Sequence, residues 1–128
     1  MADHLKFYIN GEWVNPLGSE TIEVVNPSDE SVIGSISAGT KEDIDLAVTA
    51  AKEAFKTFGF SSKEERIKLL ENIISVYEKR SEELAKTISE EMGAPLWLSN
   101  VAQVTSGLSH FKDTLEVLKT FEFEGVEN

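Results

Sequence analysis

The sequence predicts an α+β fold in which an N-terminal β-hairpin and short strands are followed by about four α-helices. Residues 1–39 contain short β-branched runs separated by turn signals. Residues 40–121 carry apolar side chains at helical spacing, and capping residues mark where the helices begin. Residues 122–128 are acidic and are predicted to be a connector.

The strands are predicted around two turn signals. Residues 7–9 and 12–14 flank Asn10 and Gly11, a pair that tolerates the positive φ angles of a two-residue hairpin turn. Residues 21–25 alternate and are β-branched, and the run NPSD at 26–29 supplies a second turn before a strand at 31–37. We therefore expect a hairpin and a small antiparallel sheet. A sheet of this size is normally stable only when it packs against a larger part of a protein.

Two helices are predicted from capping boxes, in which side-chain oxygens bind the first backbone N–H groups. Thr40 with Asp43 and Ser62 with Glu65 have the required spacing. The first helix is expected to end near residues 58–59. Its apolar stripe consists of Ile44, Ala47, Val48, Ala51, Ala54 and Phe55. The second stripe consists of Leu69, Leu70, Ile73, Ile74 and Tyr77.

Two more helices complete the predicted fold. Ser81 is expected to cap the third, which the run GAP at 93–95 ends. The last and longest runs from residue 96 to about residue 121, and Gly107 is its only helix breaker. Its apolar seam is formed by Val101, Val104, Leu108, Phe111, Leu115 and Leu118. The spacing also fits a short coiled coil, but it covers few heptads, so a core-facing helix is preferred.

Charge and cysteine content exclude several functions. Twelve Lys and Arg residues against 23 Asp and Glu residues give a net charge of −11, which repels nucleic-acid phosphates and anionic lipid. The first residues lack the layout of a secretory signal, and no apolar run approaches a bilayer span, which predicts a cytoplasmic protein without membrane contact. The absence of Cys removes disulfides, thiolate catalysis and thiolate metal sites.

Several short motifs follow one another in register over residues 5–121. They are YINGEWV at 8–14, VVNPS at 24–28, VIG at 32–34, DIDLAV at 43–48, ER at 65–66, SEELA at 81–85 and EEMGAP at 90–95. Together they resemble the start of the NAD(P)-dependent aldehyde dehydrogenase superfamily. The resemblance implies that the chain is an α+β fragment of an α/β enzyme, the outer part of its cofactor domain.

The resemblance also implies a function. Members of this superfamily oxidise an aldehyde to a carboxylic acid with NAD or NADP, using a cysteine nucleophile, a glutamate base and an asparagine that binds the oxyanion. In the family these residues and the dinucleotide loop lie downstream of this stretch. We therefore expect no catalytic residue and no bound cofactor here, no activity of the chain alone, and the remainder of an aldehyde dehydrogenase chain as its partner.

Two sets of site residues are implied by the resemblance. The long last helix passes near the substrate tunnel in the family, and its polar or small positions there are Gln103, Ser106 and Gly107. Some members bind a structural monovalent cation, and the matching positions are the backbone carbonyls of Val24 and Val25 and the carboxylate of Glu91. An Asp is more usual where Glu91 stands.

The same residues allow other interpretations. A free-standing helical module would self-associate, or dock on a full-length enzyme, through the seam at 101–118, if that seam were an exposed apolar patch. Residues 34–41 have the glycine spacing of a phosphate loop, but Thr40 and Lys41 stand in reversed order. The carboxylates on the third helix lie off its apolar stripe and are interpreted as solvated surface charge.

Overall fold

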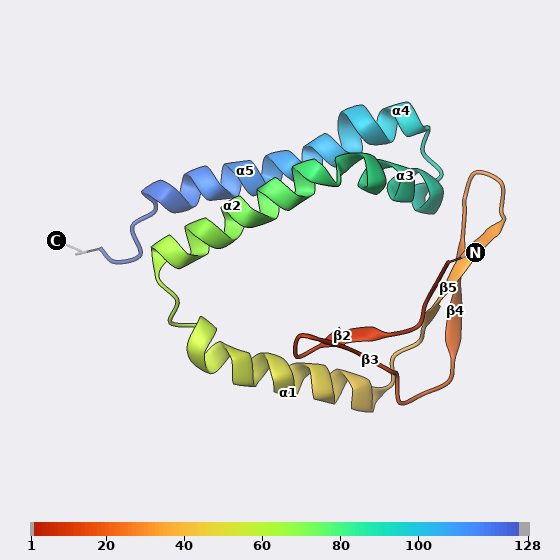
Figure 1. The fold of residues 1–128 in the computed structure, drawn as a ribbon, viewed down its shortest axis with the longest axis horizontal. Coiled ribbons are helices and arrows are strands. Elements are labelled where there is room, and N and C mark those ends of the chain that lie inside the picture. The colour runs from red at the N-terminus through yellow and green to blue at the C-terminus, as the bar shows by residue number, and fades with distance from the viewer. Residues whose placement is uncertain (1, 126–128) are drawn as a thin grey trace. The chain divides into compact units, whose positions relative to one another are not determined.

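The computed structural model describes residues 2–125 and divides the chain into two compact units. The first unit comprises Met1–Phe60 and Glu90–Gly93, and the second comprises Ser61–Ser89 and Ala94–Asn128. Strands precede helices along the chain, as the sequence predicts (Figure 1). No helix within residues 2–125 has the length and apolar character that crossing a bilayer requires.

The first unit contains two small sheets. Strands β2 (Phe7–Ile9) and β3 (Glu12–Val14) form the predicted antiparallel hairpin. Its turn has the predicted geometry, because Asn10 and Gly11 have φ angles of 54° and 81°. The second sheet has the order β1-β5-β4, with β4 (Thr21–Val25) antiparallel to β5 (Val32–Ser37). Strand β1 (Ala2–His4) adds to the other edge of β5 in parallel, so this sheet is mixed and not purely antiparallel as expected.

Helix α1 (Lys41–Phe58) begins at the predicted capping box. The Asp43 carboxylate accepts hydrogen bonds from the Thr40 backbone N–H at 2.9 Å and from the Leu17 N–H at 3.0 Å. Asp43 is buried, with 5% of its surface exposed. The two backbone donors, Thr40 first, hold the pKa of Asp43 below its ordinary value of 3.8. This carboxylate therefore ties the loop after the hairpin to the first turn of α1.

The lowered pKa of Asp43 predicts a pH-dependent effect of Asp43→Asn. The charged carboxylate stabilises the fold fully above pH 3.8, and this contribution is lost as the pH falls through the lower folded-state pKa. The variant should thus unfold at a lower urea concentration than the natural chain near neutrality, and the difference should shrink on acidification. Asp45→Asn, on the exposed part of the same helix, is the matched control. A difference that did not change with pH would contradict the assignment.

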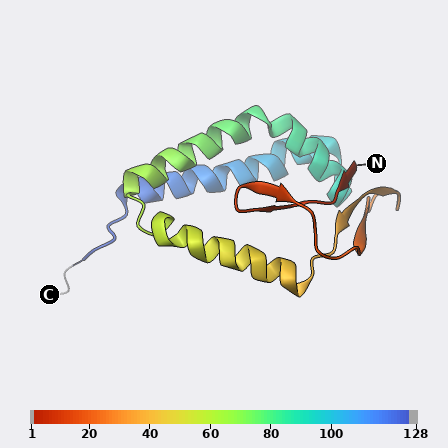
Figure 2. The same cartoon turned by 60° about the horizontal axis from the view of Figure 1, so that its bottom comes forward.

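The hairpin covers only part of α1 (Figure 2). Strand β2 contacts α1, and a hollow between the hairpin and the helix is lined in equal parts by residues 8–11 of the hairpin and by four alanines of the helix. Ile44, Val48 and Phe55, three larger residues of the predicted stripe, are exposed. The pattern predicted the helix correctly, but no other described element of the first unit buries this apolar face.

In the second unit α2 (Lys63–Lys79) packs along α5 (Val104–Thr120), and the two helices run antiparallel (Figure 1). The ion pair of Glu78 and Lys112, at 2.7 Å, joins them. Val104 and Leu115 are buried, and Leu108, Phe111 and Leu118 are half-buried. The last helix therefore faces a core, as predicted, and most of its seam is covered by α2. Val101 is the exception and is exposed.

Helix α3 (Ser81–Met92) follows α2 almost directly. Ser81 was expected to cap it, but in the structure Ser81 is the first helical residue and its hydroxyl donates to the Glu78 carbonyl at 3.0 Å. The backbone of Arg80 instead accepts the hydrogen bond of Leu84 N–H that opens the helix. The predicted end of α3 is correct, because Gly93 has a φ angle of 67°, which favours glycine.

Candidate functional site

The helix that carries three of the expected site residues changes its hydrogen-bonding pattern near its start. α4 (Leu96–Leu98) passes into a π-helical segment, η1 (Ser99–Gln103), and then into α5. The long helix expected from residue 96 is thus continuous, but its π segment was not predicted. Such segments are rare and frequently lie at functional sites.

Gln103 is the last residue of the π segment and is half-buried. Its side-chain oxygen accepts a hydrogen bond of 2.8 Å from the hydroxyl of Ser99. Ser99 has no exposed surface, which makes it the most deeply buried polar residue among those described. Ser99 and Gln103 therefore form a hydrogen-bonded pair within a single turn of the helix. Ser99 was not anticipated from the sequence.

Gly107 lies where α5 meets α2. A Cβ atom added there would lie 3.3 Å from Cζ of Tyr77 and still closer to its hydroxyl oxygen. The Tyr77 hydroxyl donates to the Val104 carbonyl at 3.0 Å, and its ring lies 5.9 Å from that of Phe111. Gly107 thus has a packing role, since it leaves room for Tyr77. Ser106, the remaining expected residue of this set, is exposed.

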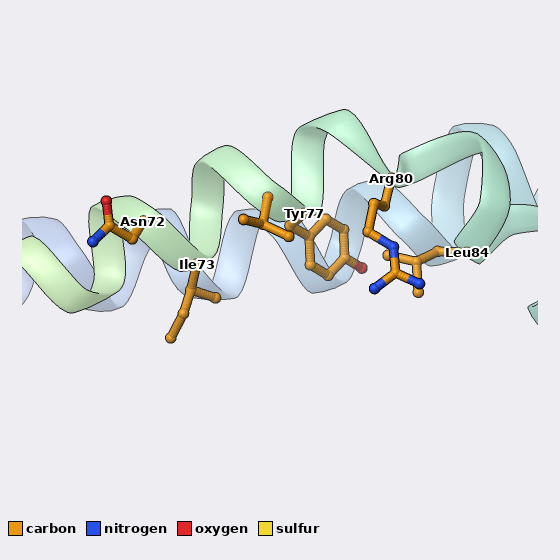
Figure 3. Close-up of a pocket in the computed structure, with 6 residues that line it drawn as sticks. Asn72, Ile73, Tyr77, Arg80 and Leu84 are labelled. Carbon is orange, nitrogen blue, oxygen red and sulfur yellow. The ribbon is translucent and has the colours of Figure 1, made fainter. Parts of the chain in front are cut away.

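A hollow of about 390 Å³ in the second unit has Tyr77 in its lining, but none of the expected site residues (Figure 3). It is lined by Asn72, Ile73, Val76, Tyr77, Arg80 and Leu84. Its lining is apolar in the middle, with Asn72 at one end and Arg80 near the other. The Arg80 guanidinium donates two hydrogen bonds of 2.7 and 2.8 Å to Glu83. This contact lowers the pKa of Glu83 and raises that of Arg80. The hollow can hold an apolar group, and its lining supplies no nucleophile or general base.

The expected cation ligands lie in the first unit. A register shift between Val24 and Val25 interrupts the pairing of β4 with β5, and such an irregularity leaves backbone groups unpaired. The end of α3 lies against the turn that follows β4, because a Cβ added to Gly93 would lie 3.0 Å from the Ser28 nitrogen. Glu91 is exposed near that end.

Side-chain clusters that would bind a metal are not found within residues 2–125, where no group of three or more His, Cys, Asp or Glu residues converges. The carboxylates of α3 are exposed, as predicted: Glu82, Glu83, Glu90 and Glu91. A cation at the end of β4 would therefore depend on backbone oxygens together with Glu91.

Comparison with known proteins identifies the family. The model of the aldehyde dehydrogenase family matches residues 13–128, and the chain belongs to this family. It is 45% identical over 125 residues to a 3-succinoylsemialdehyde-pyridine dehydrogenase of Pseudomonas sp, and 45% identical over 124 residues to a putative aldehyde dehydrogenase of Staphylococcus aureus. Each match includes 97% of this chain and 26% of the relative.

Solved structures match this chain over nearly its whole length and over about a quarter of their own. The aldehyde dehydrogenase of Bartonella henselae is 42% identical with a TM-score of 0.96, and the match covers 99% of this chain and 27% of that one. A mutant of aldehyde dehydrogenase C from Pseudomonas syringae, solved with NAD+ and octanal, is 38% identical with a TM-score of 0.92, over 96% of this chain and 25% of that one. The chain spans about a quarter of the length of these relatives, and it matches their N-terminal part.

Proposed function

We propose that this chain acts as the N-terminal part of an NAD(P)-dependent aldehyde dehydrogenase, which oxidises an aldehyde to a carboxylic acid. The observation that carries the proposal is the family match over residues 13–128 together with a TM-score of 0.96 to a solved relative four times as long. Because the 128 residues contain no Cys, the thiolate that attacks the aldehyde must come from another part of the enzyme.

The cofactor of the whole enzyme is proposed to be NAD or NADP. Several of the solved relatives contain NAD, which supports this choice. In the whole enzyme this chain would contribute outer elements of the cofactor domain, with residues 1–39 as strands, 40–121 as helices and 122–128 as a connector. Residues 126–128 lie outside the described part of the chain. A cytoplasmic location stays an expectation from the sequence.

The remainder of the enzyme is the proposed partner of the exposed apolar surfaces. Ile44 and Phe55 on α1 are 59% and 68% exposed, and burying such side chains stabilises a protein by about 1.5–3 kcal/mol each. The apolar hollow along α2 offers a second surface of this kind. We place Gln103, Ser106 and Gly107 beside the substrate path, and a monovalent cation on the carbonyls of Val24 and Val25 with Glu91.

A segment exchange tests the proposal. The matching N-terminal segment of the Bartonella henselae enzyme is replaced by this chain, and aldehyde-dependent NADH formation is followed by absorbance. We expect the chimera to form NADH, because the two segments share 42% identity and nearly the same backbone. The enzyme with that segment deleted is the control. A soluble chimera that binds NAD but does not oxidise aldehydes would contradict the proposal.

Measurements on the isolated chain complement the chimera assay. Purified alone, it should neither form NADH from an aldehyde nor change the fluorescence of Trp13 and Trp97 when NAD is added. Sedimentation of the same sample tests the alternative of a self-associating helical module. That alternative loses its main support because α2 already covers Val104 and Leu115. NADH formation by the pure chain would overturn the requirement for a cysteine from elsewhere.

A further inference from the structure

Asn10 and Gly11, at the tip of the hairpin, are the only Asn-Gly pair in the sequence. Both residues are exposed, and a Cβ atom added to Gly11 would meet nothing within 4 Å. Within residues 2–125 neither the Asn10 side chain nor the Gly11 N–H makes a hydrogen bond. No side chain and no hydrogen-bond acceptor therefore shields the backbone nitrogen that follows Asn10.

The other asparagines in the described part of the chain lack this arrangement. Asn15 and Asn26 precede prolines, whose backbone nitrogen carries no hydrogen. Asn72 and Asn100 lie in helical segments, where hydrogen bonds hold the backbone N–H groups, and each precedes a β-branched residue that crowds its nitrogen. Among residues 2–125, Asn10 is thus the asparagine whose next nitrogen is available to attack its own side chain.

We propose that Asn10 is a modification site that deamidates spontaneously to aspartate and isoaspartate. The Gly11 nitrogen attacks Cγ of Asn10, and the new N–Cγ bond replaces the Cγ–Nδ2 bond. The NH2 group takes the proton of the Gly11 N–H and leaves as ammonia. Water then opens the resulting five-membered imide, either at Cγ to give aspartate or at the backbone carbonyl to give isoaspartate. Water is the only co-reactant, and no atom is oxidised or reduced.

The folded hairpin controls the rate of this reaction. The φ angles of 54° and 81° at Asn10 and Gly11 define its two-residue turn. The imide ring requires a different ψ angle at the asparagine, so the turn has to open before the nitrogen reaches Cγ. Strands β2 and β3 have three residues each, and such short hairpins open readily. Tyr8 and Trp13 oppose the opening, because they pair across the strands with ring centroids 5.2 Å apart.

The two products affect the hairpin differently. Aspartate tolerates a positive φ angle much as asparagine does, so the turn persists in that product. Isoaspartate adds a methylene group to the main chain and thereby lengthens the loop that sets the pairing of Ile9 with Glu12. Strand β2, which contacts α1, then loses its register with β3.

Peptide mapping by mass spectrometry tests the site. The 128-residue chain is kept in mildly alkaline buffer and sampled over time. The peptide that contains Asn10 should gain about one dalton, whereas the peptides that contain Asn72 and Asn100 should keep their mass. Asn10→Gln is the matched control and should abolish the change, because its longer side chain would have to close a six-membered ring. An unmodified Asn10, or modification of all asparagines at one rate, would overturn the proposal.

Variants of the aromatic pair test the control by the hairpin. Trp13→Ala should accelerate the reaction by about two- to fivefold, the factor by which such a cross-strand pair favours the closed hairpin. Tyr8→Ala removes the other ring and serves if Trp13→Ala fails to fold. Trp97→Ala, which removes an exposed tryptophan from α4, is the control and should leave the rate unchanged. If the loss of either ring of the pair left the rate unchanged, the hairpin would not control the reaction.

Circular dichroism in the near ultraviolet compares the products after their separation by chromatography. The signal of the Tyr8 and Trp13 pair should persist in Asn10→Asp and should decrease in the isoaspartate form. An isoaspartate form with the full signal would contradict the expected loss of register. None of these measurements uses an aldehyde or NAD, so their results are independent of the proposed function.

Discussion

Gly107→Ala is expected to destabilise the chain by about 1–3 kcal/mol, because the added methyl group overlaps the Tyr77 side chain. The sign of this change in the free energy of unfolding shows whether the contact with Tyr77 matters. In a helix interior, Gly→Ala normally stabilises by about 1 kcal/mol, since alanine restricts the unfolded backbone. A net loss therefore requires the contact with Tyr77. Urea unfolding followed by circular dichroism measures the change.

A double-mutant cycle isolates that contact. Tyr77→Phe alone removes the hydrogen bond to the Val104 carbonyl and should cost about 1 kcal/mol. In the Tyr77→Phe background Gly107→Ala should cost less than in the natural chain, because the closest atom to the new methyl group, the hydroxyl oxygen, is gone. Gly125→Ala is the control, since its Cβ would meet nothing within 4 Å. Equal costs in both backgrounds would contradict the packing role of Gly107.

Elements set by local chemistry were predictable from the sequence. The Asn10-Gly11 turn and the capping boxes at Thr40 and Ser62 act on residues within four positions of themselves, and each appears where expected. Strand β1 escaped prediction for the converse reason. It forms by parallel pairing with β5, about 30 residues away, and its three residues carry no strand signal of their own.

Periodicity identified apolar faces but not the elements that cover them. The seam of the last helix and the stripe of α1 have similar patterns, yet Leu115 is buried against the second unit's core whereas Phe55 is 68% exposed. The difference depends on which helix packs against each face, and that information is not local. The same holds for the candidate site. The resemblance to the family placed Gln103 and Gly107 in one helical segment. Ser99 reaches Gln103 only because of the π turn, and Tyr77 reaches Gly107 only because α2 packs on α5.

Leu115→Ala is expected to have the largest effect on stability, a loss of about 2–4 kcal/mol from the cavity that it leaves. Leu115 is 7% exposed, and the only other buried apolar residues among those described are Ala85 and Val104. A domain is typically stable by about 5–15 kcal/mol, so this one side chain supplies a large share of the stability of the second unit.

Val117→Ala is the matched control for Leu115→Ala. It removes an apolar side chain from the same helix, but Val117 is 61% exposed, and surface changes of this kind usually lie within about 0.5 kcal/mol. Thermal unfolding of both variants should show a marked decrease in melting temperature for Leu115→Ala alone. If the two variants melted alike, the seam between α2 and α5 would not be the stabilising core of this unit. The aldehyde dehydrogenase segment would then depend on the rest of its enzyme for folding as well as for catalysis.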